Sequence, residues 1–246
     1  MLTVYYLEDD PIEAVDSLCI FTQVRTISIY LQLLCNAHHI CCSPKEMPYK
    51  ASSLTGMYSQ WVIQGEKNYE YVLLGLLQLL NRYKQFNGKE HACRKLTTSV
   101  LRVPDSMADE AYGWTIPPVY INPKRPNLLD PIAREFEVGT KEYIMACHRA
   151  NYLYRLKGYF EPSKGSIKNI EFWDKIPEWM PFREAPSRDQ VVSNNPLIGA
   201  PLESPYKRKL SSLGVVSCYL PGFTPAQEEA DISKIAEEYE DIEEDD

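Results

Sequence analysis

The feature that most constrains this chain is a run of apolar residues at helical spacing near its start. Apolar side chains recur from Val15 to Ala37 mostly at intervals of three or four, the period of a buried helical face. Asp10 is a good N-cap, and Pro11 suits the first turn, where its missing N–H costs nothing. We therefore expect one long, mostly buried helix from Pro11 to about Ile40.

Similar patterns predict further helices downstream, separated by proline-rich or loop-like stretches. They are a short helix around Trp61 and Val62, a helix capped by Asn68 and ended by Gly88, a helix from Glu90 to Leu101, and a helix capped by Thr140 that reaches Lys157. Six prolines predict an irregular segment over 104–138. The short apolar segments at 172–173 and 179–180 are expected to pack against the helical body.

Length and charge divide the chain further. A chain of 246 residues is long for one domain and short for two, so we expect one core with an appendage. The net charge of -8 hides a split, because 228–246 carry eleven acids and one base while the rest carries 25 bases and 23 acids. Prolines recur beyond residue 182. We therefore predict a helical body at 1–182, an extended Pro-rich arm at 183–223 and an acidic tail at 224–246.

The expected fold class is mainly α. It consists of a single helical-bundle-like domain with a short N-terminal strand, followed by the extended arm and an acidic amphipathic C-terminal helix that begins at the capping-box pattern Thr224–Gln227. A hydrophobic fraction of 44% excludes a wholly disordered chain. We expect neither a membrane span nor a secretory leader. Seven irregularly spaced cysteines indicate a reducing compartment.

The sequence contains few patterns that are typical of catalytic, metal-binding or nucleotide-binding sites. His38, His39, Cys41 and Cys42 crowd together, but neighbouring helical residues point in different directions and no second ligand pair completes four. Packing at a helix end is the favoured interpretation. Gly-x-Ser-x-Gly, a P-loop and Gly-x-Gly-x-x-Gly are all missing from the sequence. We expect no metal and no cofactor.

Basic residues offer two weak binding surfaces. One group lies beside Tyr152, Tyr154 and Tyr159, where phosphate contacts and base stacking are feasible, although a solvated helix face is the favoured interpretation. Its members are Arg149, Arg155, Lys157, Lys164 and Lys168. The other is Lys207, Arg208 and Lys209 in the arm. With the apolar tail residues Ile232, Ile235 and Tyr239, this patch is a candidate for binding another protein or for pairing with an acidic tail.

The sequence resembles a family of small helical proteins of tailed bacteriophages, some of which are linked to pyrimidine-dimer DNA glycosylases. The resemblance spans roughly 3–182 and rests on four blocks of matching residues. They are Tyr5 to Pro11 with Ala14 and Cys19; Gln32, Leu33, Leu34, Ala37 and His38; Trp61, Val62, Asn68, Tyr69, Tyr83, Gly88, Lys89 and His91; and Tyr143, Trp173, Pro177, Glu178, Trp179 and Met180.

The chain departs from the family at positions where the family has ionisable or other polar groups. Asp-Lys-His and a later Glu of the first helix correspond to Ile20, Phe21, Thr22 and Ile29. Asn-His-Pro-Cys corresponds to 55–58, Arg-Glu to 63–64, and a Glu and an Arg to Arg82 and Phe86. Acidic, basic and imidazole side chains are the groups that a site for removing a nucleobase would use. The resemblance therefore implies a degenerate member that has lost the ancestral chemistry.

Three functions follow from these observations. The first is a non-enzymatic bacteriophage protein, a structural or partner-binding module that meets other phage or host proteins through its arm and tail, in the virion or the host cytoplasm. The second is a DNA glycosylase or base-modifying enzyme, for which Lys89, His91 and Glu66 are the remaining catalytic candidates. The third is an acidic tail that mimics DNA and binds a host or phage protein. Nucleic acid is a further candidate partner.

Overall fold

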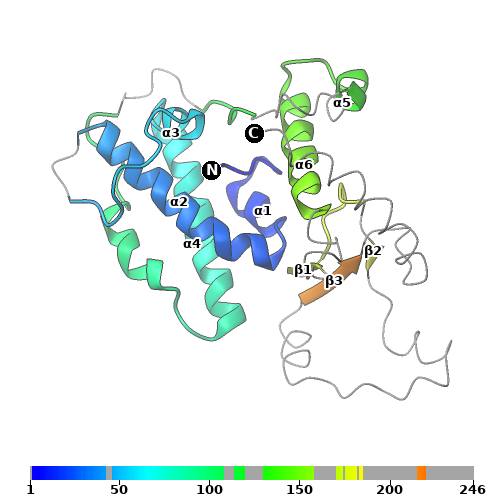
Figure 1. Ribbon diagram of the computed structural model, residues 1–246, viewed down its shortest axis with the longest axis horizontal. Helices are drawn as coiled ribbons and strands as arrows, with labels where there is room; N and C mark the ends of the chain where they lie inside the picture. The colour runs from blue at the N-terminus through cyan, green and yellow to red at the C-terminus, as the bar shows by residue number, and fades with distance from the viewer. Residues whose placement is uncertain are drawn as a thin grey trace, which may run out of the picture. The chain divides into compact units, whose positions relative to one another are not determined.

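The computed structural model is mainly helical, as predicted (Figure 1). It describes residues 2–42, 46–107, 114–119, 130–157, 170–173, 175–181, 183–184 and 215–219. The elements are α1 (Pro11–Asp16), α2 (Ile20–Ile40), α3 (Met57–Val62), α4 (Glu66–Asn87), the 3-10 helix η1 (Ala92–Ser99), α5 (Asp130–Glu135), α6 (Lys141–Lys157), β1 (Ile170–Trp173), β2 (Arg183–Glu184) and β3 (Val215–Tyr219). The chain divides into two compact units, Met1–Tyr152 and Leu153–Asp246.

The prediction of one helix from Pro11 to Ile40 is wrong, because the helix breaks between Asp16 and Ile20. Cys19 has extended backbone angles and acts as the N-cap of α2. The Gln23 side chain donates to the carbonyls of Val15 (3.1 Å) and Leu18 (2.9 Å), and the Cys19 N–H donates to the Tyr152 hydroxyl at 2.7 Å. These contacts satisfy backbone groups that the break frees.

The short N-terminal strand is also not formed, and residues 2–6 are irregular. Tyrosine side chains take the place of a partner strand. The Tyr5 N–H donates to the Tyr30 hydroxyl at 3.2 Å, and the Tyr71 hydroxyl donates to the Tyr5 carbonyl at 3.2 Å. Val4 and Leu7 are fully buried. The segment is therefore part of the core without belonging to a sheet.

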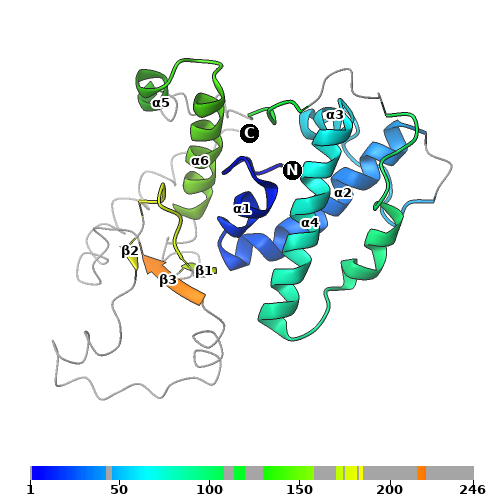
Figure 2. The same cartoon turned by 180° about the vertical axis from the view of Figure 1, so that it is seen from behind.

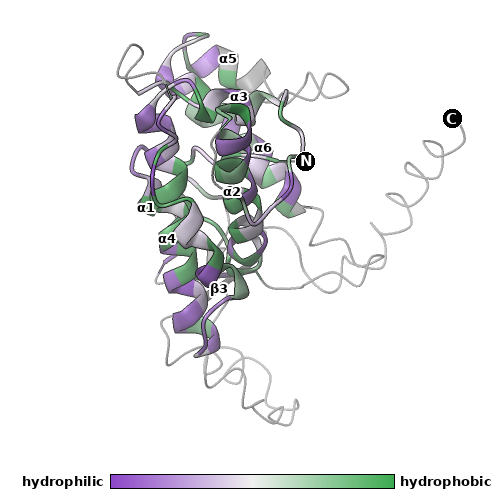
Figure 3. Ribbon diagram, turned by 90° about the vertical axis from the view of Figure 1, so that its left-hand side faces the viewer, coloured by the Kyte–Doolittle hydropathy of each residue, from purple (hydrophilic) through white to green (hydrophobic). Residues whose placement is uncertain are grey.

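Helices α2 and α4 form the main packing interface of the first unit, as two opposite views show (Figures 1 and 2). Gly75 makes their close approach feasible, since a Cβ there would lie 2.8 Å from Tyr30 Cε2 and 3.3 Å from Val15 Cγ1. Apolar and polar stretches alternate along the ribbon of α4 in Figure 3, as expected for a helix with one buried face.

The other helix predictions have mixed outcomes. Helix α3 forms around Trp61, Gly88 ends α4 in the left-handed region (φ 69°), and Thr140 Oγ1 accepts the Tyr143 N–H at the start of α6. However, Asn68 is not a cap, because α4 starts after Gly65 and Asn68 lies buried inside its first turns. The helix expected from Glu90 is the 3-10 helix η1 instead.

The second unit contains a small antiparallel sheet that the sequence did not predict. Its strand order is β1-β3-β2, with Ile170 opposite Cys218, Trp173 opposite Val215, and Arg183 opposite Tyr219. Strands β2 and β3 belong to the predicted arm. The rest of that arm (185–214 and 220–223) and the predicted acidic helix at 224–246 lie outside the described residues, so both stay predictions.

Candidate functional site

The three candidate catalytic residues do not come together. Glu66 is exposed in the first turn of α4, whereas Lys89 is exposed just after Gly88, the residue that ends this helix. A helix rises about 1.5 Å per residue, so on the order of 33 Å separates residues 66 and 88. A glycosylase site would need an acid and an amine that both reach the same nucleobase. Glu66 and Lys89 are too far apart for this.

His91 acts as the N-cap of η1. Its Nδ1 accepts the Cys93 N–H at 3.1 Å, and its ring packs edge-on against Tyr83 with centroids 4.7 Å apart. Burial lowers the pKa of His91 below its ordinary value. The neutral imidazole therefore has a structural use here, as an acceptor at a helix start.

Several residues that carry the family resemblance contact one another. Asn68 Nδ2 donates to the Trp61 carbonyl at 2.9 Å, and His38 Nε2 lies 3.1 Å from the Tyr69 hydroxyl. That hydroxyl donates to the Val100 carbonyl at 2.7 Å. These contacts hold α2, α3, α4 and the segment after η1 together, so the matched residues have roles in the framework.

The positions where the family has ionisable groups do not gather into one pocket. Ile20 and Thr22 are buried at the start of α2, and the exposed Phe21 lies under the Arg25 guanidinium at 5.6 Å. The 55–58 segment lies much further along α2, because Ser59 Oγ accepts from Asn36 Nδ2 at 2.9 Å. Sixteen residues of helix between 20 and 36 correspond to roughly 24 Å.

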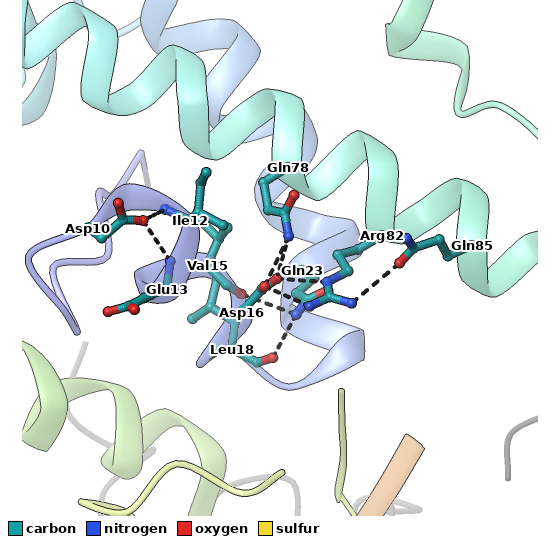
Figure 4. A network of polar contacts seen from close by, with 10 residues as sticks. All are labelled: Asp10, Ile12, Glu13, Val15, Asp16, Leu18, Gln23, Gln78, Arg82 and Gln85. Atoms are coloured by element: carbon teal, nitrogen blue, oxygen red, sulfur yellow. Dashed lines mark hydrogen bonds and ion pairs between the residues drawn. The ribbon is translucent and has the colours of Figure 1, made fainter. Parts of the chain in front are cut away.

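Arg82 takes part in a polar network that fastens α1 to α4 (Figure 4). Its guanidinium binds the Asp16 carboxylate through Nε (2.9 Å) and NH2 (2.7 Å), and Gln78 Nε2 donates to the same two oxygens at 3.0 and 2.9 Å. Asp16 lies in the last turn of α1, where a carboxylate is disfavoured by the helix dipole. The arginine offsets that cost, so Arg82 has a structural role at this position.

Arg149, one of the basic residues predicted to contact nucleic acid, is engaged within the first unit. Arg149 Nε donates to the Leu7 carbonyl at 2.9 Å and its NH2 lies 3.0 Å from Glu8 Oε2. Tyr152 is buried and its hydroxyl accepts from Cys19, so its ring is not presented to a base. Arg155 is exposed. The side chains of Lys157, Lys164, Lys168, Lys207, Arg208, Lys209, Ile232, Ile235 and Tyr239 lie outside the described residues.

The structure contains an aromatic cluster that the sequence patterns do not predict. We call Tyr6, Trp61, Tyr71 and Trp114 the Trp114 cluster. Trp114 lies on Tyr71 with ring centroids 5.0 Å apart, meets the edge of Trp61 at 5.8 Å and lies 6.2 Å from Tyr6. Trp114 is 38% exposed, whereas its three partners are buried. One aromatic residue of the cluster is thus presented to solvent on a buried aromatic base.

Hydrogen bonds fix the backbone that carries Trp114. Asn68 exchanges two hydrogen bonds with Thr115, one from the Thr115 N–H to Oδ1 at 3.0 Å and one from Nδ2 to Thr115 Oγ1 at 2.7 Å. Trp61 Nε1 donates to the Thr115 carbonyl at 3.0 Å. Further along, His148 Nε2 lies 3.3 Å from the Pro117 carbonyl. The segment is therefore held at Thr115 and at Pro117.

The phenols beneath Trp114 stay protonated at neutral pH. Burial raises the pKa of Tyr6, and the hydrogen bond from its hydroxyl to Asp9 Oδ1 (2.6 Å) raises it further. Burial likewise raises the pKa of Tyr71. Asp9 also pairs with Lys141 at 2.6 Å. The cluster is thus an uncharged aromatic surface with a compensated ion pair beside it.

Among the described residues, no group of three or more His, Cys, Asp or Glu side chains is arranged to hold a metal ion. No helix in that part of the chain is both long and apolar enough to cross a membrane. Comparison of the chain with protein-family models, with curated proteins and with solved structures gave no match. The resemblance to the phage family therefore stays a prediction.

Proposed function

We propose that this chain is a non-enzymatic bacteriophage protein whose helical body is a structural or partner-binding module. The arm and the acidic tail are additional attachment elements in this proposal. Its phage origin rests on the sequence resemblance. Its binding role rests on one observation, the exposed Trp114 ring on a rigid aromatic base.

Trp114 has the properties of a binding anchor. Tryptophan is enriched among the residues that dominate interface energetics, especially where it is held in one orientation before binding. The packing against Tyr71 and the three hydrogen bonds of Thr115 remove much of the freedom that Trp114 would otherwise lose on binding. A partner that covers the ring therefore gains apolar burial at a small cost in entropy.

The test is native purification after nuclease treatment, with companions identified and quantified by mass spectrometry. We expect a phage or host protein at fixed stoichiometry that Trp114→Ala releases. Trp114→Phe, which keeps a ring above Tyr71, should retain part of the bound companion protein. Leu101→Ala is the matched control, because Leu101 is 50% exposed and does not belong to the cluster.

Two results would overturn the proposal. One is a companion that stays bound to Trp114→Ala although denaturation shows this variant to be folded. The other is a set of companions that disappears with nuclease and contains only replication or repair proteins, which would favour DNA processing. In that case, borohydride trapping on damaged DNA with Lys89→Ala as control would identify an imine-forming lysine.

A further inference from the structure

Helix α2 ends in two adjacent cysteines that differ from the other described thiols. Cys41 is its half-buried C-cap, and Cys42 is exposed, whereas Cys19, Cys35, Cys93 and Cys147 are buried. Cys42 also has φ 50°, a left-handed conformation that non-glycine residues adopt at a cost. The pair therefore combines access for a reagent with an unfavourable backbone conformation.

The two side chains are placed for different tasks. Cys42 Sγ lies 3.8 Å from the Ile40 carbonyl, so its side chain folds back along the chain past residue 41. Burial raises the pKa of the Cys41 thiol above its ordinary value, although a hydrogen bond with Ser106 lowers it in part, and the neighbouring Cys42 adds a smaller increase. Cys42 is thus the accessible thiol that reacts first, and Cys41 is the thiol that follows.

We propose that Cys41 and Cys42 form a reversible oxidation site for hydroperoxides. The Cys42 thiolate attacks the terminal peroxide oxygen, the O–O bond breaks, and the products are a sulfenic acid and an alkoxide or hydroxide that takes up a proton. The Cys41 sulfur then attacks the sulfenic sulfur, which forms the S–S bond and releases hydroxide, and this leaves as water with the Cys41 proton. Two thiols thereby supply the two electrons that reduce one peroxide.

The resulting disulfide would be easily reduced. Adjacent Cα atoms lie about 3.8 Å apart across a trans peptide, whereas disulfides usually join Cα atoms about 4.4–6.8 Å apart. A bond closed at the shorter spacing is strained, and strained, exposed disulfides are the labile and regulatory ones. This property suits a reducing compartment, where disulfides are transient.

Formation of the 41–42 disulfide also affects the segment after η1. The Cys41 carbonyl accepts a hydrogen bond from Ser106 Oγ at 2.7 Å. This carbonyl belongs to the 41–42 peptide, which lies inside the eight-membered ring and must reorient when the ring closes. Oxidation therefore breaks the contact to Ser106 and loosens residues 100–107.

The experiment treats the full-length reduced protein with hydrogen peroxide and counts free thiols after denaturation. We expect the count to fall from the seven cysteines of the chain to five, to recover with dithiothreitol, and fragment spectra to place the bond between 41 and 42. Cys41→Ser should stop at a sulfenic acid on Cys42 that dimedone traps. Cys42→Ser should keep all its thiols on the same timescale.

Hydrogen exchange measures the second part of the proposal. Oxidised wild-type protein should exchange faster over 100–107, reduced Ser106→Ala should reproduce part of this change, and Cys42→Ser should show none after peroxide. Overoxidation of Cys42 while Cys41 stays reduced would overturn the disulfide. A 41–42 disulfide without faster exchange over 100–107 would overturn its coupling to Ser106.

Discussion

The two ends of α4 are built in opposite ways. At the start, Asn68 is fully buried and hydrogen-bonds to Trp61 and Thr115, beside the Trp114 cluster. At the end, Gly88 turns the chain into solvent with nothing within 4 Å of where its Cβ would be, and Lys89 follows exposed. The same helix is therefore anchored at one end and open at the other.

This difference separates Lys89 and His91, two of the three candidate catalytic residues, from the buried and hydrogen-bonded start of the helix, while Glu66 lies exposed in its first turn. The lysine and histidine that invite an enzymatic interpretation lie at the open end. The solvent-facing Trp114 lies at the anchored end, next to Thr115, which is hydrogen-bonded to Asn68. The following predictions test this contrast between the two ends.

The largest effect is expected for Asn68→Ala. The substitution removes three hydrogen bonds of a buried side chain and leaves the Thr115 N–H without this acceptor, so we expect a loss of about 3 kcal/mol in the free energy of unfolding. Urea denaturation measures it. Asn87→Ala at the open end is the control, since Asn87 donates only to the Tyr83 carbonyl at 3.2 Å in the described contacts. Equal losses for both variants would contradict the contrast.

Gly75→Ala should cost about 2 kcal/mol, because the new methyl group would lie 2.8 Å from the fully buried Tyr30 ring, so that the ring or the helix must shift. Gly88→Ala has free space around it and carries only the cost of a left-handed backbone, about 1 kcal/mol. Thermal denaturation of the two variants side by side gives the comparison. A more stable Gly75→Ala protein would show that helix propensity outweighs the steric clash.

The coupling between Asp16 and Arg82 should be about 1 kcal/mol in a double-mutant cycle with Asp16→Asn and Arg82→Gln, because the pair is bidentate and its side chains are 24% and 18% exposed. The Lys67–Glu70 pair near the start of α4 is the reference. It is 65% and 40% exposed and should give about 0.3 kcal/mol. Indistinguishable coupling energies would mean that the polar network of Figure 4 does not fasten α1.

The smallest effect concerns His91 and pH. Because burial lowers its pKa in the folded state, the unfolded state binds the proton more readily, and stability should fall as the pH drops from 7.5 through the ordinary histidine pKa to 5. Protonation also removes the Nδ1 acceptor for the Cys93 N–H. His91→Asn keeps a capping oxygen and should lose this part of the pH dependence of the urea midpoint. An unchanged pH profile in that variant would exclude the effect.

Local sequence patterns predicted the elements whose ends are fixed by neighbouring residues. Asp10 with Pro11, Gly88 and Thr140 mark helix ends through contacts within a few residues, so these ends could be found without a structure. The break before Ile20 could not, because no Gly or Pro interrupts residues 12–40 and one of its contacts comes from Tyr152.

The candidate site could not be predicted from the sequence for a similar reason. Trp114 follows a stretch without helical period and its supporting residues come from three separate parts of the chain, so apolar spacing gave no indication of the cluster. Asparagine favours the N-cap position, so the local pattern predicts a cap at Asn68, but its partner Thr115 is 47 residues away. Tertiary partners override local preference at both positions.

The buried N-terminal segment has a consequence for how this chain is made. The Leu7 carbonyl bonds to a residue 142 positions later, and the Tyr5 carbonyl to one 66 positions later. A ribosome delivers these early residues long before Tyr71 and Arg149 exist, so their contacts close only when most of the unit has been synthesised. Until then, the apolar stretch from Val4 to Leu7 lacks the residues that bury it in the folded protein. We expect chaperones to bind there, or aggregation to begin there.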